Sequence, residues 1–306
     1  MTVRVAGIGS YLPPEVVTNH DLEKTMDTSD EWIRERSGIG ERRVGGVTSA
    51  MAIHAAEAAL ADAGLQAGDI DFLILCTTTP DQVFPATSAT VAAGLGIECG
   101  AMDVNVVCAG FPYAYVSAYG MMLTPGGPER MLVIGSDALS GIVDWTDRST
   151  AILFGDGAGA VVLERHEQGE ILAQDFAVNG DLKSILYCEK GDTIKMEGRE
   201  VFKRAVRAVT TSVGQVLAKA GVDPSDVDVV LPHQANIRII EAMAERIGIP
   251  MDKTFNVLER TGNTSSASIP LAMAAAHKAG ALAPHRLVLM TGFGAGMAWG
   301  SVLLKW

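Results

Sequence analysis

Several features that would assign a chain to a special class are missing from these 306 residues. The sequence holds no Cys-x-x-Cys pair and no His and Cys cluster with zinc spacing. No apolar run is long enough to cross a bilayer, and the first residues lack the charged and then apolar layout of a signal peptide. We therefore expect a cytoplasmic protein with reduced thiols, no metal and no membrane association. The four cysteines are Cys76, Cys99, Cys108 and Cys188.

Positive charge is also scarce. The chain carries 24 Lys and Arg against 36 Asp and Glu, a formal net charge of −12. Nucleic acid is therefore not expected as a partner, because phosphate binding needs a basic face. An acidic protein partner would need a local basic patch. The composition is otherwise that of a globular protein, with 48% hydrophobic residues, and it permits a sizeable core.

The second half of the chain repeats the pattern of the first. A helix end, a glycine turn and an apolar strand occur at 61–75 and again at 218–231, offset by 157 residues from Asp71 to Asp228. Strands at 131–134 and 287–290 form a second pair, and Gly-rich runs at 154–160 and 292–296 form a third. We interpret the repeat as two copies of one α/β domain related by a pseudo-twofold axis. The halves are expected at 1–166 and 167–306.

Apolar strands alternate with Ala-rich segments that have helical periodicity, at 49–63, 202–220 and 237–247. This alternation predicts a layered α/β fold with buried strands. The segment 71–75 is apolar on both faces, as expected for a strand covered by helices on two sides.

Cys108 is the one cysteine that follows a strand and directly precedes an expected helix, at 109–122. A thiol at a helix N-terminus is expected to have a lowered pKa, which makes it a candidate nucleophile. His233 follows a buried strand, and so lies at the sheet edge where α/β proteins bind ligands. Asn263 stands in a small, polar run before an apolar segment, where an Asn is usually a cap or turn residue.

Taken together and in this order, Cys108, His233 and Asn263 resemble the catalytic triad of the β-ketoacyl-acyl-carrier-protein synthase III family. The resemblance covers essentially the whole chain. It implies the duplicated, five-layered αβαβα thiolase fold, in agreement with the internal repeat. Further matching motifs are GSYLP at 9–13, TSDEWI at 28–33, FP at 84–85, GDGAG at 155–159 and WGS at 299–301.

The resemblance implies a reaction. Cys108 takes an acyl group from acyl-CoA, and the acyl group is then condensed with malonyl-acyl-carrier protein with loss of carbon dioxide. His233 and Asn263 hold the enolate oxygen, and the backbone N–H groups of Cys108 and Ala295 form the oxyanion hole. The acyl-CoA is a substrate, and no permanently bound cofactor is implied. The product, a 3-oxoacyl-acyl-carrier protein, starts fatty acid or polyketide synthesis.

The resemblance also implies binding residues and a homodimer. Trp32 and Arg148 would hold the adenine of CoA between them. Phe84 would cross the dimer interface to the acyl pocket of the partner, and Phe293 would line the acyl pocket. The remaining CoA contacts would be Arg36, Asn236 and Phe202, and the patch for the acidic carrier protein would be Lys203, Arg207 and Arg238.

Two alternatives stay open. The acyl group would pass to a small-molecule acceptor in a specialised-metabolism relative, or the chain would be a non-catalytic dimeric scaffold. The starter acyl group also stays open, because the segment 179–196, which caps the acyl tunnel, looks short for the family.

Overall fold

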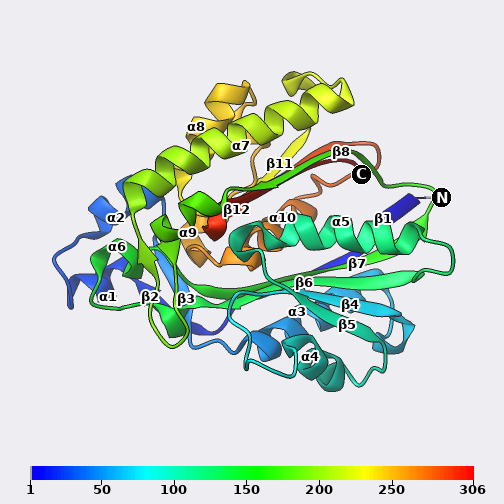
Figure 1. The fold of residues 1–306 in the computed structure, drawn as a ribbon, viewed down its shortest axis with the longest axis horizontal. Coiled ribbons are helices and arrows are strands. Elements are labelled where there is room, and N and C mark those ends of the chain that lie inside the picture. The colour runs from blue at the N-terminus through cyan, green and yellow to red at the C-terminus, as the bar shows by residue number, and fades with distance from the viewer. Residues whose placement is uncertain (1) are drawn as a thin grey trace.

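The apolar segments of the chain form two mixed β-sheets that are stacked with helices between and outside them (Figure 1). The structure is a computed structural model and describes residues 2–306. The first sheet has the strand order β1 (Thr2–Tyr11), β7 (Asp156–His166), β6 (Arg130–Ala138), β4 (Phe72–Cys76) and β5 (Gly100–Val104). The second has the order β8 (Glu170–Val178), β13 (Ala298–Lys305), β12 (Leu287–Gly294) and β11 (Val229–Pro232).

Helices occupy three layers around these sheets (Figure 1). Between the sheets lie α5 (Gly110–Leu123) and α10 (Ser268–Lys278), which share one apolar core with strands of both. The first sheet is covered on its outer face by α3 (Thr48–Ala63) and α4 (Thr87–Leu95). The second is covered by α7 (Gly198–Ala220) and α8 (Ile237–Ile247). The result is the five-layered αβαβα arrangement that the resemblance implied.

Smaller elements complete the chain. Four short helices are α1 (Asn19–Glu23), α2 (Asp30–Ser37), α6 (Arg148–Ala151) and α9 (Leu258–Thr261). Two strand pairs lie outside the main sheets, β2 (Glu15–Thr18) with β3 (Glu41–Val44), and β9 (Leu186–Tyr187) with β10 (Lys195–Met196). No helix among residues 2–306 is both long and apolar enough to cross a membrane.

The two sheets repeat one topology. In both, an antiparallel pair (β1 and β7, or β8 and β13) continues through β6 or β12 to a parallel neighbour, β4 or β11. The place of β5 in the second sheet is taken by Thr254, which forms an isolated parallel bridge to Val230. The predicted pairing of β4 with β11 and of β6 with β12 is therefore consistent with the fold.

The predicted equivalence of the Gly-rich runs at 154–160 and 292–296 is wrong. Residues 156–160 begin β7, whereas 292–294 end β12, so the two runs lie on strands that are not equivalent. The strand of the second half that corresponds to β7 is β13. Glycine is frequent in both runs because each lies under a buried helix or turn at close range. A Cβ at Gly159, for example, would lie 2.7 Å from the Cβ of Pro270 in α10.

Candidate active site

The turn that carries Cys108 joins β5 to α5. The side-chain Oδ1 of Asn105 accepts a hydrogen bond from the N–H of Val107 at 3.2 Å. Val107 has a φ of +50°, a conformation that costs a β-branched residue about 1–3 kcal/mol and persists only where the surroundings impose it. The turn delivers Cys108 to the N-terminal end of α5, within one residue of the predicted helix start.

Burial of the Cys108 side chain is the largest influence on the pKa of its thiol. The residue is only 5% exposed, and desolvation raises the pKa of the thiol to about 12, although the neighbouring Ser265 side chain opposes the rise. The expected lowering of this pKa is therefore wrong. The partial charge at a helix end is worth about 0.3–1 kcal/mol. Removing a thiolate from water costs more, so the free enzyme holds a neutral thiol.

His233 follows β11 and lies at the carboxyl edge of the second sheet, as predicted. Its side chain is 3% exposed, and its Nδ1 lies 2.7 Å from the Oγ of Ser268, the first residue of α10. The ring of Phe293 packs against the imidazole in an edge-on geometry, with centroids 5.4 Å apart. Burial lowers the pKa of His233 to about 3, so the imidazole is neutral at physiological pH.

Asn263 lies in a turn between α9 and α10. Its backbone is paired in both directions with the segment before β7, through its N–H to Leu153 O (2.8 Å) and through its carbonyl oxygen to Gly155 N–H (3.0 Å). Its side-chain Oδ1 accepts from the N–H of Ser265 at 2.9 Å, and this bond leaves the NH2 group for the cavity beside it.

A buried carboxylate holds this turn against the first half of the chain. Asp137, at the end of β6, accepts hydrogen bonds from the N–H and the hydroxyl of Ser266 at 2.9 and 2.6 Å. It also accepts from the loop after β4, including the N–H of Thr78 at 2.7 Å. Asp137 is fully buried, so these donors take the place of water around its charge. Local sequence patterns do not reveal the role of Asp137, because its partners are far apart in the chain.

The two residues predicted to supply the oxyanion donors, Cys108 and Ala295, border one cavity. The N–H of Cys108 precedes the first hydrogen bond of its 3-10 turn, which runs from Ala109 N–H to the carbonyl of Val106, and so has no intrahelical partner. The backbone at Gly294 packs directly on it, since a Cβ there would lie 2.7 Å from the Cys108 nitrogen. Ala295 follows and borders a cavity that Cys108 also lines.

One cavity of about 530 Å³ reaches Cys108, His233 and Asn263 together. A second, of about 1040 Å³, also reaches Cys108 and is bordered by residues 186–194 of the β9–β10 hairpin. Cys108 therefore borders two spaces, each large enough for part of an elongated substrate. The first cavity is also lined by four of the predicted CoA contacts and by a predicted acyl-pocket residue, Trp32, Arg36, Phe202, Asn236 and Phe293.

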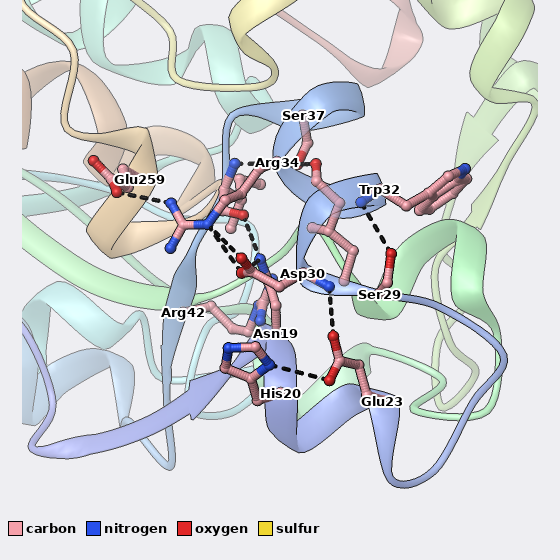
Figure 2. A network of polar contacts seen from close by, with 12 residues as sticks. Asn19, His20, Glu23, Ser29, Asp30, Trp32, Arg34, Ser37, Arg42 and Glu259 are labelled. Atoms are coloured by element: carbon pink, nitrogen blue, oxygen red, sulfur yellow. Dashed lines mark hydrogen bonds and ion pairs between the residues drawn. The ribbon is translucent and has the colours of Figure 1, made fainter.

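The helix α2, which carries Trp32 and Arg36, is anchored by a polar network (Figure 2). Asp30 accepts from Asn19 and from the guanidinium of Arg34, both at 2.9 Å. Arg34 also donates to Glu259 of α9 at 2.8 Å. Because α9 leads directly into the Asn263 turn, the network connects the helix that carries Trp32 with the turn that carries Asn263.

Two predicted CoA contacts already have protein partners. The guanidinium of Arg148 lies 4.7 Å from the ring centroid of Trp32, so a base held between them requires Arg148 to move outward. The Asn236 side chain caps α8 by accepting from Arg238 N–H, and it donates to the carbonyl oxygen of Arg36 at 2.9 Å. Asn236 thus joins α8 to α2 in addition to bordering the cavity.

The three residues of the predicted carrier-protein patch, Lys203, Arg207 and Arg238, are all exposed on α7 and α8. The guanidinium of Arg238 lies 5.6 Å from the ring of Phe202 and lines the cavity of Trp32. The patch therefore begins at the cavity mouth. Phe84 borders neither of the two cavities and is 83% exposed.

Comparisons with known proteins agree with this fold. A solved structure, 3-oxoacyl-[acyl-carrier-protein] synthase III from Aquifex aeolicus VF5, matches 99% of this chain and all of its own with a TM-score of 0.96 and 46% identity. A fold and site of this kind define a thiolase-fold condensing enzyme.

The sequence comparisons specify the family. Residues 102–180 match the model of 3-oxoacyl-[acyl-carrier-protein (ACP)] synthase III, and residues 217–306 match the model of its C-terminal part. The beta-ketoacyl-[acyl-carrier-protein] synthase III 1 of Bacillus anthracis is 47% identical over all of this chain and 99% of its own. The synthase III of Rhodobacter capsulatus is 47% identical over the whole of both chains. The chain belongs to the β-ketoacyl-acyl-carrier-protein synthase III family and is a condensing acyltransferase, as the resemblance implied.

Proposed function

We propose that this enzyme starts fatty acid synthesis by joining the acyl group of an acyl-CoA to malonyl-acyl-carrier protein, with loss of carbon dioxide. The observation that carries the proposal is the single cavity shared by Cys108, His233 and Asn263, with Trp32 and Arg36 at its other end. A nucleophile and two neutral hydrogen-bond donors in one buried space suit a reaction whose charge develops on thioester oxygens.

The first step acylates Cys108. Its sulfur attacks the thioester carbonyl carbon, the bond from that carbon to the CoA sulfur breaks, and the thiol proton passes to the departing CoA. The N–H groups of Cys108 and Ala295 stabilise the oxyanion of the tetrahedral intermediate. Because the free thiol is neutral, its proton must leave as the new bond forms.

The second step uses the other two side chains. The carboxylate of the malonyl group leaves as carbon dioxide, and the electron pair of the broken bond forms an enolate. His233 and the NH2 group of Asn263 donate to the enolate oxygen. The enolate carbon then attacks the acyl carbonyl and the bond to the Cys108 sulfur breaks. The sulfur keeps the electron pair and takes up a proton from solvent, which restores the neutral thiol, and the 3-oxoacyl thioester is released. Both donors suit this role because neither carries a charge that would hold the malonyl carboxylate in place.

The binding surfaces follow from the same cavity. CoA would enter past Trp32 with Arg148 displaced, and the acidic carrier protein would dock on Lys203, Arg207 and Arg238. A homodimer is supported by Phe84 and Val83, which are 83% and 70% exposed and would be covered by a second copy. No resident cofactor is proposed, since both reacting groups arrive as thioesters. A cytoplasmic location stays a prediction.

We further propose that the halves 1–166 and 167–306 divide the chemistry. The chain leaves the first sheet at His166 and enters the second at Glu170. The nucleophile would come from the first half, and the two oxygen-binding side chains from the second.

Intact-mass measurement after mixing the enzyme with a panel of acyl-CoAs tests the first step. We expect a single acyl adduct, which is absent in Cys108→Ala and present in the matched control Cys188→Ala, which removes an exposed thiol. His233→Ala and Asn263→Ala should still form the adduct but lose malonyl decarboxylation. Normal decarboxylation by both variants would contradict the assigned roles. An acyl adduct that passes to a small acceptor without carbon dioxide release would favour the specialised-metabolism alternative.

A further inference from the structure

We propose that Ser268 is a positioning residue that fixes the neutral His233 imidazole as its Nε2–H tautomer, so that the ring acts on the substrate as a proton donor. This inference rests on the proposed function of His233. It adds a residue that supplies the orientation and the proton position without touching the substrate.

The hydrogen-bond partners of the Ser268 hydroxyl lead to this assignment. Within residues 2–306, its Oγ has two polar partners, Nδ1 of His233 at 2.7 Å and the N–H of Gln234 at 3.3 Å. A backbone N–H can only donate, so Gln234 uses an acceptor site of the oxygen. The hydroxyl hydrogen is then left with one acceptor, Nδ1 of His233. A nitrogen that accepts carries no proton, and the imidazole proton must be on Nε2.

The charged form of the ring would allow a different arrangement, with Nδ1–H donating to Ser268. Burial of His233 disfavours that form, as its lowered pKa reflects. None of the Asp and Glu side chains of residues 2–306 forms an ion pair with His233, in contrast to His20, His54 and His277, which each lie within 3.3 Å of a carboxylate. The structure therefore favours a neutral ring.

The ring is also held in place on its other sides. Phe293 packs edge-on against it, and the side chain of Gln234 joins the His233 turn to the segment before α9. That side chain donates to Pro232 O at 2.7 Å and accepts from the N–H of Val257 at 3.1 Å. Ser268 itself is fully buried in the first turn of α10, so its hydroxyl does not drift with a mobile loop. Nε2, the remaining polar atom of the ring, is left for the cavity that His233 lines.

This arrangement has a mechanistic consequence. A ring that presents Nε2–H to the cavity donates to an enolate oxygen, but it cannot accept the Cys108 proton without first giving up its own. His233 therefore acts in the decarboxylation step and not as the resting base of the acylation step. Ser268 controls the second step alone.

The test determines the tautomer of His233 and measures the kinetics of malonyl decarboxylation. In protein labelled with ¹⁵N at histidine, long-range ¹H–¹⁵N spectra report which ring nitrogen carries the proton, and the spectrum of His233→Gln identifies the His233 signals by their loss. We expect wild-type His233 to be neutral with Nε2–H. In Ser268→Ala we expect signals of both tautomers or of their exchange. The kcat for malonyl decarboxylation should fall about tenfold, equivalent to one lost hydrogen bond, with KM unchanged.

Two controls separate this role from a structural one. Ser268→Thr keeps the hydroxyl and should retain the Nε2–H tautomer and most of the kcat. Acylation of Cys108 by acyl-CoA, followed by mass, should be normal in both Ser268 variants. Wild-type protein with the proton on Nδ1 would overturn the inference, whichever variants fold. If His233→Ala lacks decarboxylation in that case, the proposed function still stands and only the role of Ser268 falls.

Discussion

Asn105 and Asn263, which are 158 residues apart in the chain, perform the same backbone task in the two halves of the molecule. Each accepts, through its Oδ1, the N–H of the residue two positions later, at 3.2 and 2.9 Å. In each case that residue, Val107 or Ser265, has a φ of +50°. The same turn thus precedes α5 and α10. In the first half it precedes Cys108 and in the second it contains Asn263, and the two residues line the same cavity.

Removing the first of these turn bonds should weaken the nucleophile turn. In Asn105→Ala, the Val107 N–H loses its acceptor, and we expect the free energy of unfolding to fall by about 0.5–1.5 kcal/mol. The rate of Cys108 acylation should fall as well, because the strained Val107 conformation is no longer held. Asn105→Asp keeps the acceptor oxygen and is the matched control. Urea unfolding and adduct mass measure the two effects, and unchanged acylation in Asn105→Ala would show that the turn does not depend on this bond.

A methyl group at Gly294 should block the oxyanion site. Its Cβ would lie 2.7 Å from the Cys108 nitrogen, which is closer than such atoms approach without a shift of the backbone. We expect Gly294→Ala to lose Cys108 acylation by at least about a hundredfold. Gly214→Ala in α7 is the control, since a Cβ there meets no atom within 4 Å. It should keep acylation and gain about 0.5–1 kcal/mol of stability from higher helix propensity. Equal acylation rates in both variants would contradict the close approach.

The neutral thiol of Cys108 gives a distinct pH profile. With its pKa near 12, the alkylation rate of the free enzyme by iodoacetamide should rise about tenfold per pH unit from pH 7 to 9 without levelling off. The measurement uses Cys188→Ser, which removes the exposed thiol, and follows modification of Cys108 by peptide mass. A plateau near neutral pH would show that Cys108 is already a thiolate, as predicted from the sequence.

His233 should make the stability of the protein depend on pH. Its pKa is about 3 in the folded protein and 6.5 in the unfolded chain, so between these values the unfolded chain binds a proton that the folded protein does not. The free energy of unfolding is not reduced by His233 above pH 6.5. As the pH falls from 6.5 toward 3, protonation of His233 in the unfolded chain lowers it by up to about 1.4 kcal/mol per pH unit. The free energy of unfolding, measured with urea, should therefore fall more steeply with decreasing pH in wild type than in His233→Gln. Parallel curves would show that the imidazole is protonated in the folded state.

The network around α2 should affect binding and leave the chemistry unchanged. Arg34→Ala removes the bridge from Asp30 to Glu259 and loosens the helix that carries Trp32. We expect the KM for acyl-CoA in the acylation step to rise about threefold, because exposed ion pairs are weak, with kcat unchanged. Lys24→Ala is the control, since its ion pair with Asp21 does not reach α2. A fall in kcat alone would place the network in the catalytic step.

Much of the architecture was predictable from local patterns. The helix expected at 237–247 is α8 (Ile237–Ile247), and the strand expected at 71–75 is β4 (Phe72–Cys76). Such elements are predictable because hydrophobic periodicity is a property of consecutive residues. The pairing of 154–160 with 292–296 was wrong for the same reason, since glycine-rich runs look alike whichever strand they belong to. An offset of 158 residues between NVVCAG at 105–110 and NTSSAS at 263–268 was the signal that would have revealed the shared turn.

The sequence by itself determined the duplication of one α/β domain, the order of the elements and the three residues that the family places at the reaction centre. Only the tertiary structure decided their chemical states. The Cys108 thiol is neutral because of what surrounds it, and His233 has a defined tautomer because α10 brings Ser268 within 2.7 Å, 35 residues along the chain. Protonation depends on desolvation and on partners across space, and those are set by packing between segments that no local pattern connects.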